Sequence, residues 1–472
     1  MRGNNSNYHN SWGKSPSFKT ESSNFEQNTQ RVLLSDLPAT FQDAIYVCRS
    51  LSIEYLWIDS LCIIQDDQDD WKKECALMGM VYQNACLTIA ASRAEGDSSG
   101  FLGDRQSSSH FTDEWSIFHE VSKGLYLFKT PQQVRAVPID LELPLHKRAW
   151  TVQERYLATR VVSFRDNLVE WDCLESHHDE SGLTAYPNRG VLGIVTCMGY
   201  YGQISEFTQA AVHAQPTQFP LPLAAWSTLL HTYSWSAITR PSDRLPALAG
   251  IASVISDRTH QKYYAGIWEH WVVEGLAWEI HSSNEVSHYR APSWSWLSLE
   301  GGVRMHDLGS ANCQHLADIV EIWVEVDPKY PFGEINGGIL KLTGPTMNVC
   351  GWKTIYYSYW IVVKSQDRYY AMMAQLDLAS TEPRGGERVC VLSHEPENRL
   401  TALIVAPDSH GLYKRIGITW SHLYLLPNSN ADKTEETIWE QLEHDIYELD
   451  YHQEESFQSC VGNLPRETFT II

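Results

Sequence analysis

The sequence predicts an α/β protein of three parts. Helical and strand-like segments alternate near the N-terminus, which is the order expected of a parallel sheet flanked by helices. Mainly helical periodicity follows, and the last third consists of short strand-like runs separated by turn residues. We therefore expect an α/β domain at 1–175, a mainly helical segment packed on it at 176–288, and a β-rich domain at 289–472.

Two strands and two helices are expected in the first part of the α/β domain. In LPATFQDAIYVCRSL, apolar side chains recur at helical spacing from Phe41 to Cys48, behind a proline suited to a helix start. The apolar runs at 55–63 and 86–91 are typical of strands buried on both faces. A regular apolar stripe predicts a helix at 70–84. Because such a crossover joins parallel strands, we expect the two strands to be parallel neighbours.

The later elements follow from the same patterns. RAWTVQERYL predicts a helix at about 148–158, and RVVSF and LVEWDC behind it predict a hairpin. Broad apolar faces in AAWSTLLHTYSWSAIT, DRLPALAGIASVISDR and AGIWEHWVVEGLAWEI predict further helices. Strand-like runs from IVEIWVEV to LYKRIGITW predict a β sandwich or barrel. The acidic stretch DKTEETIWEQLEHDIYELD predicts a solvated tail helix.

Charge and composition limit the classes of partner. The formal net charge of -22 disfavours nucleic acid and anionic membranes as partners. No apolar run is long enough for a membrane span, and the polar start lacks a signal core, so we expect a cytoplasmic protein. The cysteines are scattered without a C-x-x-C pair. Cys173, His177 and His178 have metal-ligating side chains but no second half-site, so we expect no metal.

Two blocks of sequence resemble the fungal heterokaryon incompatibility (HET) domain family. The second block, Arg-x-Trp-x-x-Gln-Glu, is matched by Arg148, Trp150, Gln153 and Glu154. The first block is matched by Leu56, Trp57, Ile58, Asp59, Leu61, Cys62, Ile63, Gln65, Glu74, Met78, Tyr82 and Ala85. SDRLPALAGIA and RAPSWSWLSLEG are similar to segments that follow the domain in many fungal members. The resemblance implies a fungal effector of self/non-self recognition and regulated cell death.

The resemblance also implies a mechanism. The HET domain is thought to be a distant relative of the Toll/interleukin-1 receptor (TIR) fold, which has a parallel sheet flanked by helices. Many TIR domains cleave NAD⁺ with one glutamate placed as Trp-x-x-x-Glu, and Trp150 and Glu154 have this spacing. A carboxylate beside the ribose can stabilise oxocarbenium character, so NAD⁺ is the expected substrate and no cofactor is required.

The candidate site residues follow from this resemblance and from their places on the elements. Glu154 is the candidate catalytic residue, and Trp150 is a candidate for substrate binding. Asp59 and Gln65 flank the carboxyl end of a predicted strand, where open α/β sheets bind ligands. We expect Glu154 to reach a cleft bordered by this loop, with Trp150 anchoring the helix against the sheet. A structural alternative is that Glu154 pairs with nearby arginines and Gln65 bonds to its own loop.

The start of the chain departs from the family. NYHNSWG keeps Ser11 and Trp12, which we assign to substrate binding, but no apolar strand precedes them. In a TIR-like sheet that strand is central, and its loss would expose two strand edges. Either the first residues form a minimal strand, or the copy is shortened and its activity is in doubt. Two classes of mechanism stay open: an NAD⁺-cleaving enzyme, and a non-catalytic module that binds itself or an unidentified incompatibility partner.

Overall fold

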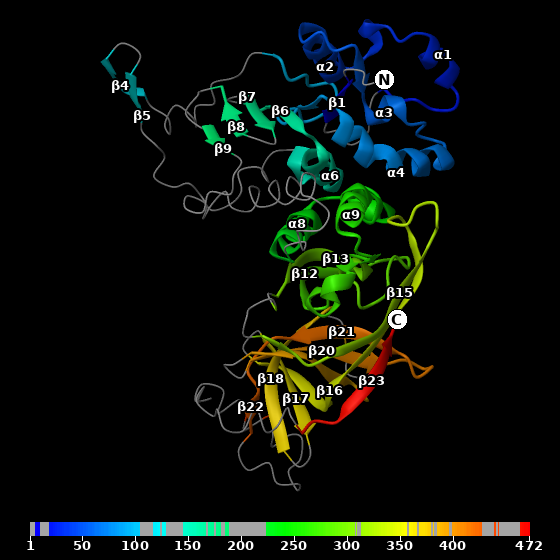
Figure 1. Cartoon of the computed structure of the whole chain (residues 1–472), viewed down its shortest axis with the longest axis vertical. Coiled ribbons are helices and arrows are strands. Elements are labelled where there is room, and N and C mark those ends of the chain that lie inside the picture. The colour runs from blue at the N-terminus through cyan, green and yellow to red at the C-terminus, as the bar shows by residue number, and fades with distance from the viewer. Residues whose placement is uncertain are drawn as a thin grey trace. The chain divides into compact units, whose positions relative to one another are not determined.

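The chain forms two compact units, and each is described by itself (Figure 1). Unit 1 comprises Met1–Thr228 and Ser236–Thr259, and unit 2 comprises Leu229–Trp235 and His260–Ile472. The expected division into three domains stays a prediction. The computed structural model describes residues 5–9, 18–103, 117–122, 125–128, 145–166, 169–173, 176–180, 185–187, 223–306, 308, 313–355, 358–365, 368–378, 381, 385–395, 399–426, 439, 442 and 463–472.

Unit 1 contains a seven-stranded mixed sheet of order β2-β1-β3-β6-β7-β8-β9. The first four strands of this order are parallel, and the remaining pairs are antiparallel. The predicted hairpin behind the 148–158 helix is therefore present as β6 and β7. The strands are β1 (Asn5–His9), β2 (Tyr55–Trp57), β3 (Leu87–Ala90), β6 (Arg160–Phe164), β7 (Val169–Cys173), β8 (Ser176–Asp179) and β9 (Ala185–Pro187).

The polar N-terminal segment forms the inner strand β1. It pairs in parallel with β2 on one side, where Asn7 lies opposite Trp57, and with β3 on the other, where Asn7 lies opposite Thr88. Segments 55–63 and 86–91 were expected to be neighbours, and this expectation is wrong because β1 lies between them. Of the two alternatives for the start of the chain, the minimal strand is the one formed. Its backbone hydrogen bonds on both sides stabilise it without an apolar sequence pattern.

The prediction of a strand over 55–63 is also wrong for the residues after Trp57. Strand β2 ends there, and a short helix α3 (Asp59–Cys62) follows. The Asp59 carboxylate accepts the backbone N–H of Ser60 at 2.9 Å, a local bond that favours a turn over an extended chain. As a result Cys62, which an extended strand would bury, is exposed.

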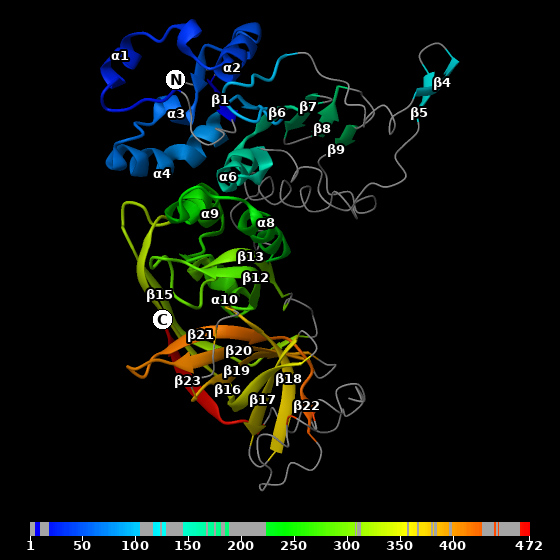
Figure 2. The same cartoon turned by 180° about the vertical axis from the view of Figure 1, so that it is seen from behind.

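Helices cover the two faces of the sheet differently (Figure 1, Figure 2). Helix α2 (Ala39–Ser50) packs on one face through an apolar cluster that includes Phe41, Ile89 and Phe164. Helices α4 (Gln68–Asn84) and α6 (Ala149–Leu157) lie on the other, where Trp57 of β2 contacts Tyr82 of α4. The predicted helix 70–84 and its apolar stripe are confirmed.

A third helix of unit 1 comes from a distant part of the sequence. Helix α9 (Pro246–Thr259) packs against both α4 and α6, as the three-way arrangement in Figure 1 shows. A 3-10 turn, η4 (Pro241–Arg244), leads into it. The remaining described elements of unit 1 are α1 (Phe25–Gln30), η1 (Leu34–Asp36), the hairpin β4 (Ile117–Ser122) with β5 (Leu125–Phe128), and η3 (Leu145–Lys147); α8 (Leu223–Trp235) contains the boundary between the units.

Unit 2 is built on a ten-stranded sheet, which confirms the expected β-rich C-terminal region. Strands β16, β17, β18, β21, β20 and β19 pair in that order, and β19 pairs back to β16, so six strands close into a ring. Buried side chains such as Met372 and Ile404 form its core. These strands are β16 (Ile335–Ile355), β17 (Ser358–Ser365), β18 (Arg368–Leu376), β19 (Arg388–His394), β20 (Leu400–Pro407) and β21 (Tyr413–Thr419).

Further strands extend this sheet. Strand β23 (Arg466–Ile471) pairs with β16, and β14 (Gln314–His315) and β22 (Tyr424–Leu425) lie at its ends. Strand β15 (Asp318–Val326) pairs with the first half of β16. Of the expected acidic tail helix, the described residues Trp439 and Leu442 are helical and buried. The smaller elements are β10 (Tyr263–Tyr264), β11 (Ile267–Trp268), η5 (Glu269–Trp271), α10 (Val272–Gly275), β12 (Trp278–Glu285), η6 (Trp296–Ser298) and β13 (Leu299–Met305). The helix expected in AGIWEHWVVEGLAWEI is wrong, because this stretch forms β11, η5, the single turn α10 and the start of β12.

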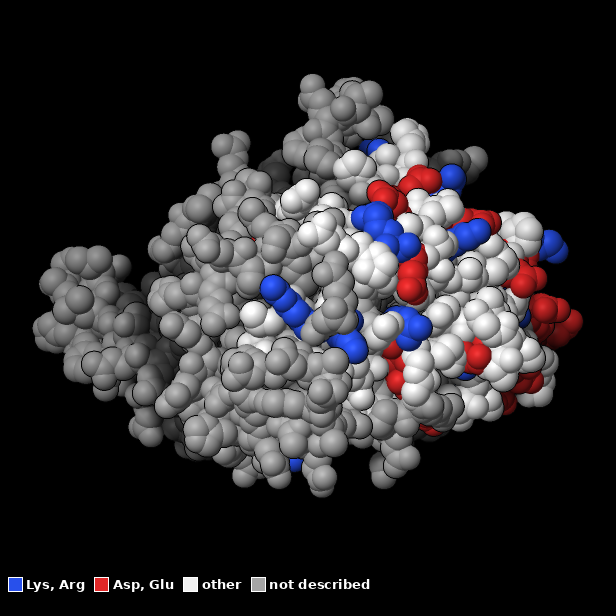
Figure 3. Space-filling view, turned by 90° about the horizontal axis from the view of Figure 1, so that it is seen from below, with Lys and Arg blue, Asp and Glu red and all other residues white. Residues whose placement is uncertain are grey.

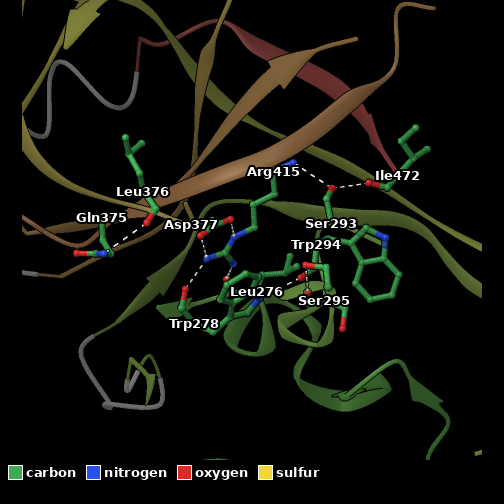
Figure 4. Close-up of polar contacts among 11 residues, drawn as sticks. Leu276, Trp278, Ser293, Trp294, Ser295, Gln375, Leu376, Asp377, Arg415 and Ile472 are labelled. Atoms are coloured by element: carbon green, nitrogen blue, oxygen red, sulfur yellow. Dashed lines mark hydrogen bonds and ion pairs between the residues drawn. The ribbon is translucent and has the colours of Figure 1, made fainter. Parts of the chain in front are cut away.

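A buried ion pair joins the closed ring to β12 within unit 2 (Figure 4). The Arg415 guanidinium of β21 contacts the Asp377 carboxylate at 3.0 Å and lies 3.2 Å from the centre of the Trp278 ring. It also donates to the backbone carbonyls of Leu276 at 2.7 Å and Trp278 at 2.5 Å. Burial raises the pKa of Asp377, while Arg415 opposes that shift.

The surface carries both signs of charge. Figure 3 shows basic and acidic side chains interleaved over the described part of one face, despite the strongly acidic total. Within the described ranges, no helix is both long and apolar enough to cross a membrane.

Candidate functional site

Helix α6 carries the Arg-x-Trp-x-x-Gln-Glu motif, and its residues contact three different segments. Arg148, at the N-cap, forms a β-bridge with Ala237, and the backbone N–H of Ala149 donates to the Ala237 carbonyl at 2.9 Å. These contacts hold the start of α6 to the segment that leads into α9. Gln153 and Glu154, one turn further on, are buried.

Glu154 lies beneath helix α4 and is 6% exposed. Its carboxylate is hydrogen-bonded to the phenol of Tyr82, which is 1% exposed. Burial and then the charges of Glu154 and Asp59 raise the pKa of Tyr82 well above its usual value, and Arg148 opposes them. The phenol is therefore protonated at neutral pH and donates to the carboxylate.

Glu154 belongs to a layer of buried polar side chains between the sheet and helices α4 and α6. The cleft expected beside it stays a prediction. Thr88 lies in register with Trp57 by way of β1, and Trp57 contacts Tyr82 of α4, so Thr88 points to the side of the sheet that α4 covers. Ser163 lies in register with Ala90, two positions after Thr88 on β3, and therefore points to the same side. We call Tyr82, Thr88, Glu154 and Ser163 the polar layer, and all four are buried.

One hydroxyl of the polar layer, the Thr88 Oγ1 atom, has no hydrogen-bond partner among the described residues. Leaving a buried hydroxyl unpaired costs about 1–3 kcal/mol, so this side of the sheet is less favourably packed than the apolar face under α2. An unpaired buried hydroxyl is a group that a polar ligand can satisfy if the helices above it move.

Trp150 lies one turn before Glu154 on α6, and both side chains contact helix α4. The Trp150 indole N–H donates to the Asp243 carboxylate of η4 at 3.4 Å, and its ring meets Trp71 of α4 edge-on, with 6.4 Å between ring centres. We expected Trp150 to anchor the helix against the sheet. It does anchor the helix, but against α4 and η4.

Asp59 is the first residue of the short helix α3 that follows β2, and Gln65 lies in the loop after that helix. The charge of Asp59 acts on Tyr82, which places this carboxylate near the polar layer. The Gln65 side chain donates to the backbone carbonyls of Ile63 at 3.0 Å and Asp59 at 3.3 Å, and so bonds to its own loop. Ser11 and Trp12 lie outside the described residues.

The contact that sequence reasoning missed is between α6 and α9. The Gln153 Oε1 atom accepts the backbone N–H of Gly250 at 2.8 Å. Helices α4 and α9 also cross closely there, since a Cβ atom on Gly79 would lie 2.9 Å from the Gly250 Cα. The resemblance of SDRLPALAGIA to segments that follow the domain was the one signal that pointed to this partnership.

No metal-type cluster of His, Cys, Asp and Glu occurs among the residues that the structure describes. Cys173 of the expected cluster lies in β7, with its Sγ atom 3.6 Å from the Ser176 Oγ. The chemistry available in the polar layer is that of a carboxylate, a phenol and hydroxyls. Such groups can hold sugar hydroxyls and stabilise positive charge on a ribose.

The comparisons with known proteins found a family match for the N-terminal part of unit 1. Neither the curated proteins nor the solved structures contain a match to this chain. The matched family region runs from residue 10 to Glu154, so β6 to β9 and helix α9 of unit 1 lie beyond it. Residues 10–154 match the model of the family described as Heterokaryon incompatibility protein (HET), and this part of the chain is therefore similar to that family.

Proposed function

We propose that this chain acts in heterokaryon incompatibility, as an effector of a fungal cell-death response, and that unit 1 does so as a signalling module. In this proposal Glu154 is a framework residue, not a catalyst. The module works by binding a second copy or an incompatibility partner. The similarity of residues 10–154 to the HET family supports the incompatibility role.

One observation carries the framework role of Glu154. Its side chain is 6% exposed and is already hydrogen-bonded to the protonated Tyr82 phenol. A catalytic carboxylate must reach its substrate, and this one is buried against Tyr82 of helix α4. The other motif side chains are engaged as well, since Trp150 bonds to Asp243 and Gln153 to Gly250.

A second candidate function is cleavage of NAD⁺ or a related nucleotide, with Glu154 as the catalytic residue. The unpaired Thr88 hydroxyl favours it, because it lies in the same layer as the Glu154 carboxylate. The Asp59 charge also acts on this layer. The layer would become a TIR-like ribose site if α4 and α6 separated from the sheet.

Inducible expression in a filamentous fungus, scored as growth arrest, tests the proposal. Glu154→Gln is the informative variant, because the glutamine oxygen still accepts the Tyr82 phenol while the charge is lost. We expect cell killing to persist in Glu154→Gln and to weaken in Glu154→Ala, which leaves the phenol unpaired. Protein amount, measured in the same cultures, is the control for folding.

The outcomes separate the two functions. Killing that is lost in both variants at unchanged protein amount, together with loss of cellular NAD⁺ in the wild type, contradicts the signalling proposal and supports cleavage. Absence of growth arrest with a folded, expressed wild-type chain contradicts the incompatibility role itself.

A further inference from the structure

Strand β15 is an open edge of the large sheet in unit 2. It pairs with β16 on one side, and no described strand pairs with its other side. Both cartoon views show it along the outer side of the sheet (Figure 1, Figure 2). An open edge presents unpaired backbone N–H and C=O groups that another extended chain can meet.

The central part of β15 is regular. Register shifts lie between Ile319 and Glu321 and between Glu325 and Val326, and the pairing with β16 is continuous between them. Glu321, Trp323 and Glu325 alternate along this stretch and are all exposed. They therefore point to one face of the sheet, with an aromatic ring between two carboxylates.

Protection against aggregation does not account for this surface. Charged side chains alone are sufficient to keep an edge strand from pairing. Here Trp323 is 40% exposed and Val320 is 56% exposed, on the same strand as the glutamates. Exposed aromatic and β-branched side chains on an open edge favour pairing with another strand, and the charges then select which strand.

A second copy of this chain is a poor occupant. In an antiparallel pair centred on Trp323, Glu321 of one copy would face Glu325 of the other. In a parallel pair each glutamate would face its own counterpart. Both arrangements place like charges directly opposite each other, which is destabilising.

We propose that the outer edge of β15 binds an extended peptide segment of a partner protein, in which basic side chains flank an apolar one. Lysine or arginine residues two positions on either side of the apolar residue would lie opposite Glu321 and Glu325. The apolar residue would cover Trp323. On β16, Glu325 lies opposite Gly337, which has no side chain, while Glu321 lies opposite Lys341, so the Glu325 carboxylate is the one without a cross-strand neighbour.

Backbone hydrogen bonds supply affinity in this mode of binding, and the side chains supply selectivity. The proposal concerns unit 2 and does not depend on the function of Glu154. It gives the β-rich region the task of recognising a basic, extended segment of a partner.

The test uses the full chain and a short labelled peptide, Thr-Lys-Thr-Val-Thr-Lys-Thr, in which both lysines lie two positions from the valine and on the same face. Fluorescence anisotropy measures its affinity, and hydrogen exchange reports which amides become protected. Two further peptides are needed, one with glutamate in place of lysine and one with N-methyl groups on alternate amides. The charge-reversed variant is Glu321→Lys/Glu325→Lys. Glu26→Lys/Glu54→Lys, at exposed positions of unit 1, is the control with the same change in net charge.

We expect the lysine peptide to bind and to protect amides in 318–326. The charge-reversed variant should bind it at least about tenfold more weakly, and should bind the glutamate peptide instead. The control variant should bind like the wild type, and the N-methylated peptide should not bind. The proposal is overturned by absence of binding, by equal binding of the N-methylated peptide, by equal loss in the control variant, or by protection outside β15.

Discussion

The side-chain oxygen of Gln153 accepts a hydrogen bond from the backbone N–H of Gly250, at 2.8 Å and across 97 positions of sequence. This bond joins the motif helix α6 to α9. Trp150 makes a second link, from α6 to Asp243 of η4, the turn that leads into α9. The unit that contains the HET-like segment therefore depends on residues well beyond Glu154, where the family match ends.

Gln153→Met tests the first link. The substitution keeps an unbranched side chain of similar length but removes the acceptor, so a buried N–H loses its side-chain partner. We expect unit 1 to lose about 1–3 kcal/mol of stability, seen as faster hydrogen exchange in α6 and α9. Gln27→Met, at an exposed position of α1, is the matched control and should have an effect within about 0.5 kcal/mol. Equal effects of both variants would contradict the proposed role of the bond.

Gly79→Ala tests the close crossing of α4 and α9. Alanine normally stabilises a helix relative to glycine by about 0.5–1 kcal/mol. Here the new Cβ atom would lie 2.9 Å from the Gly250 Cα and 3.2 Å from the Leu157 Cδ1 atom, so the helices must separate. We expect a net destabilisation of about 1–3 kcal/mol in thermal or urea unfolding.

Gly103 provides the control for this prediction. A Cβ atom there meets nothing within 4 Å, so Gly103→Ala should leave stability nearly unchanged. A Gly79→Ala chain that is as stable as the wild type would show that α4 and α9 do not cross as closely as described.

The raised pKa of Tyr82 predicts a loss of stability at alkaline pH. The unfolded chain releases the phenol proton near 10.0, while the folded chain holds it to a higher pH. The stabilisation from Tyr82 is therefore fully present below the unfolded pKa of 10.0 and is lost as the pH rises from there toward the higher folded pKa, because the folded state then binds more protons than the unfolded state. Tyr82→Phe should flatten the alkaline part of the stability profile. Tyr55→Phe, at an exposed tyrosine, should not, and equal profiles for the two variants would refute the assignment to Tyr82.

The Arg415–Asp377 pair predicts strong non-additivity in unit 2. Arg415→Met leaves the Asp377 carboxylate buried without its cation, so we expect a loss of about 3–5 kcal/mol. Asp377→Leu should cost a similar amount, because it leaves the guanidinium unpaired. The double variant should be more stable than either single variant, as measured by urea unfolding. Additive losses would show that the two side chains do not interact.

The sequence predicted the parts of unit 1 that rest on local periodicity. The helix at 70–84 was recognisable because Cys75, Met78 and Tyr82 recur on one face, and all three are buried. The strand expected at 55–63 was too long, because the local bond between Asp59 and Ser60 turns the chain into α3. An apolar run does not distinguish a strand from a strand followed by a buried helical turn.

Strand β1 and the role of α9 could not be predicted in this way. Asn5–His9 has no apolar alternation, and its place in the sheet comes from pairing with two neighbours. The partners of Gln153 and Trp150 lie in η4 and α9, far along the chain. For the candidate site, the place of Asp59 soon after a strand followed from the apolar run that precedes it. The Tyr82 phenol as the partner of Glu154 did not, since helix periodicity assigns Tyr82 only to the core.

The central claim is that Glu154 is a framework residue of a signalling module. Incubating the purified full chain with NAD⁺ and measuring nicotinamide release tests it most directly, with the Glu154→Gln protein beside it and hydrogen exchange confirming that both are folded. The account predicts no nicotinamide release above the buffer rate from either protein. Release by the wild type that disappears in folded Glu154→Gln would contradict the account and identify Glu154 as catalytic.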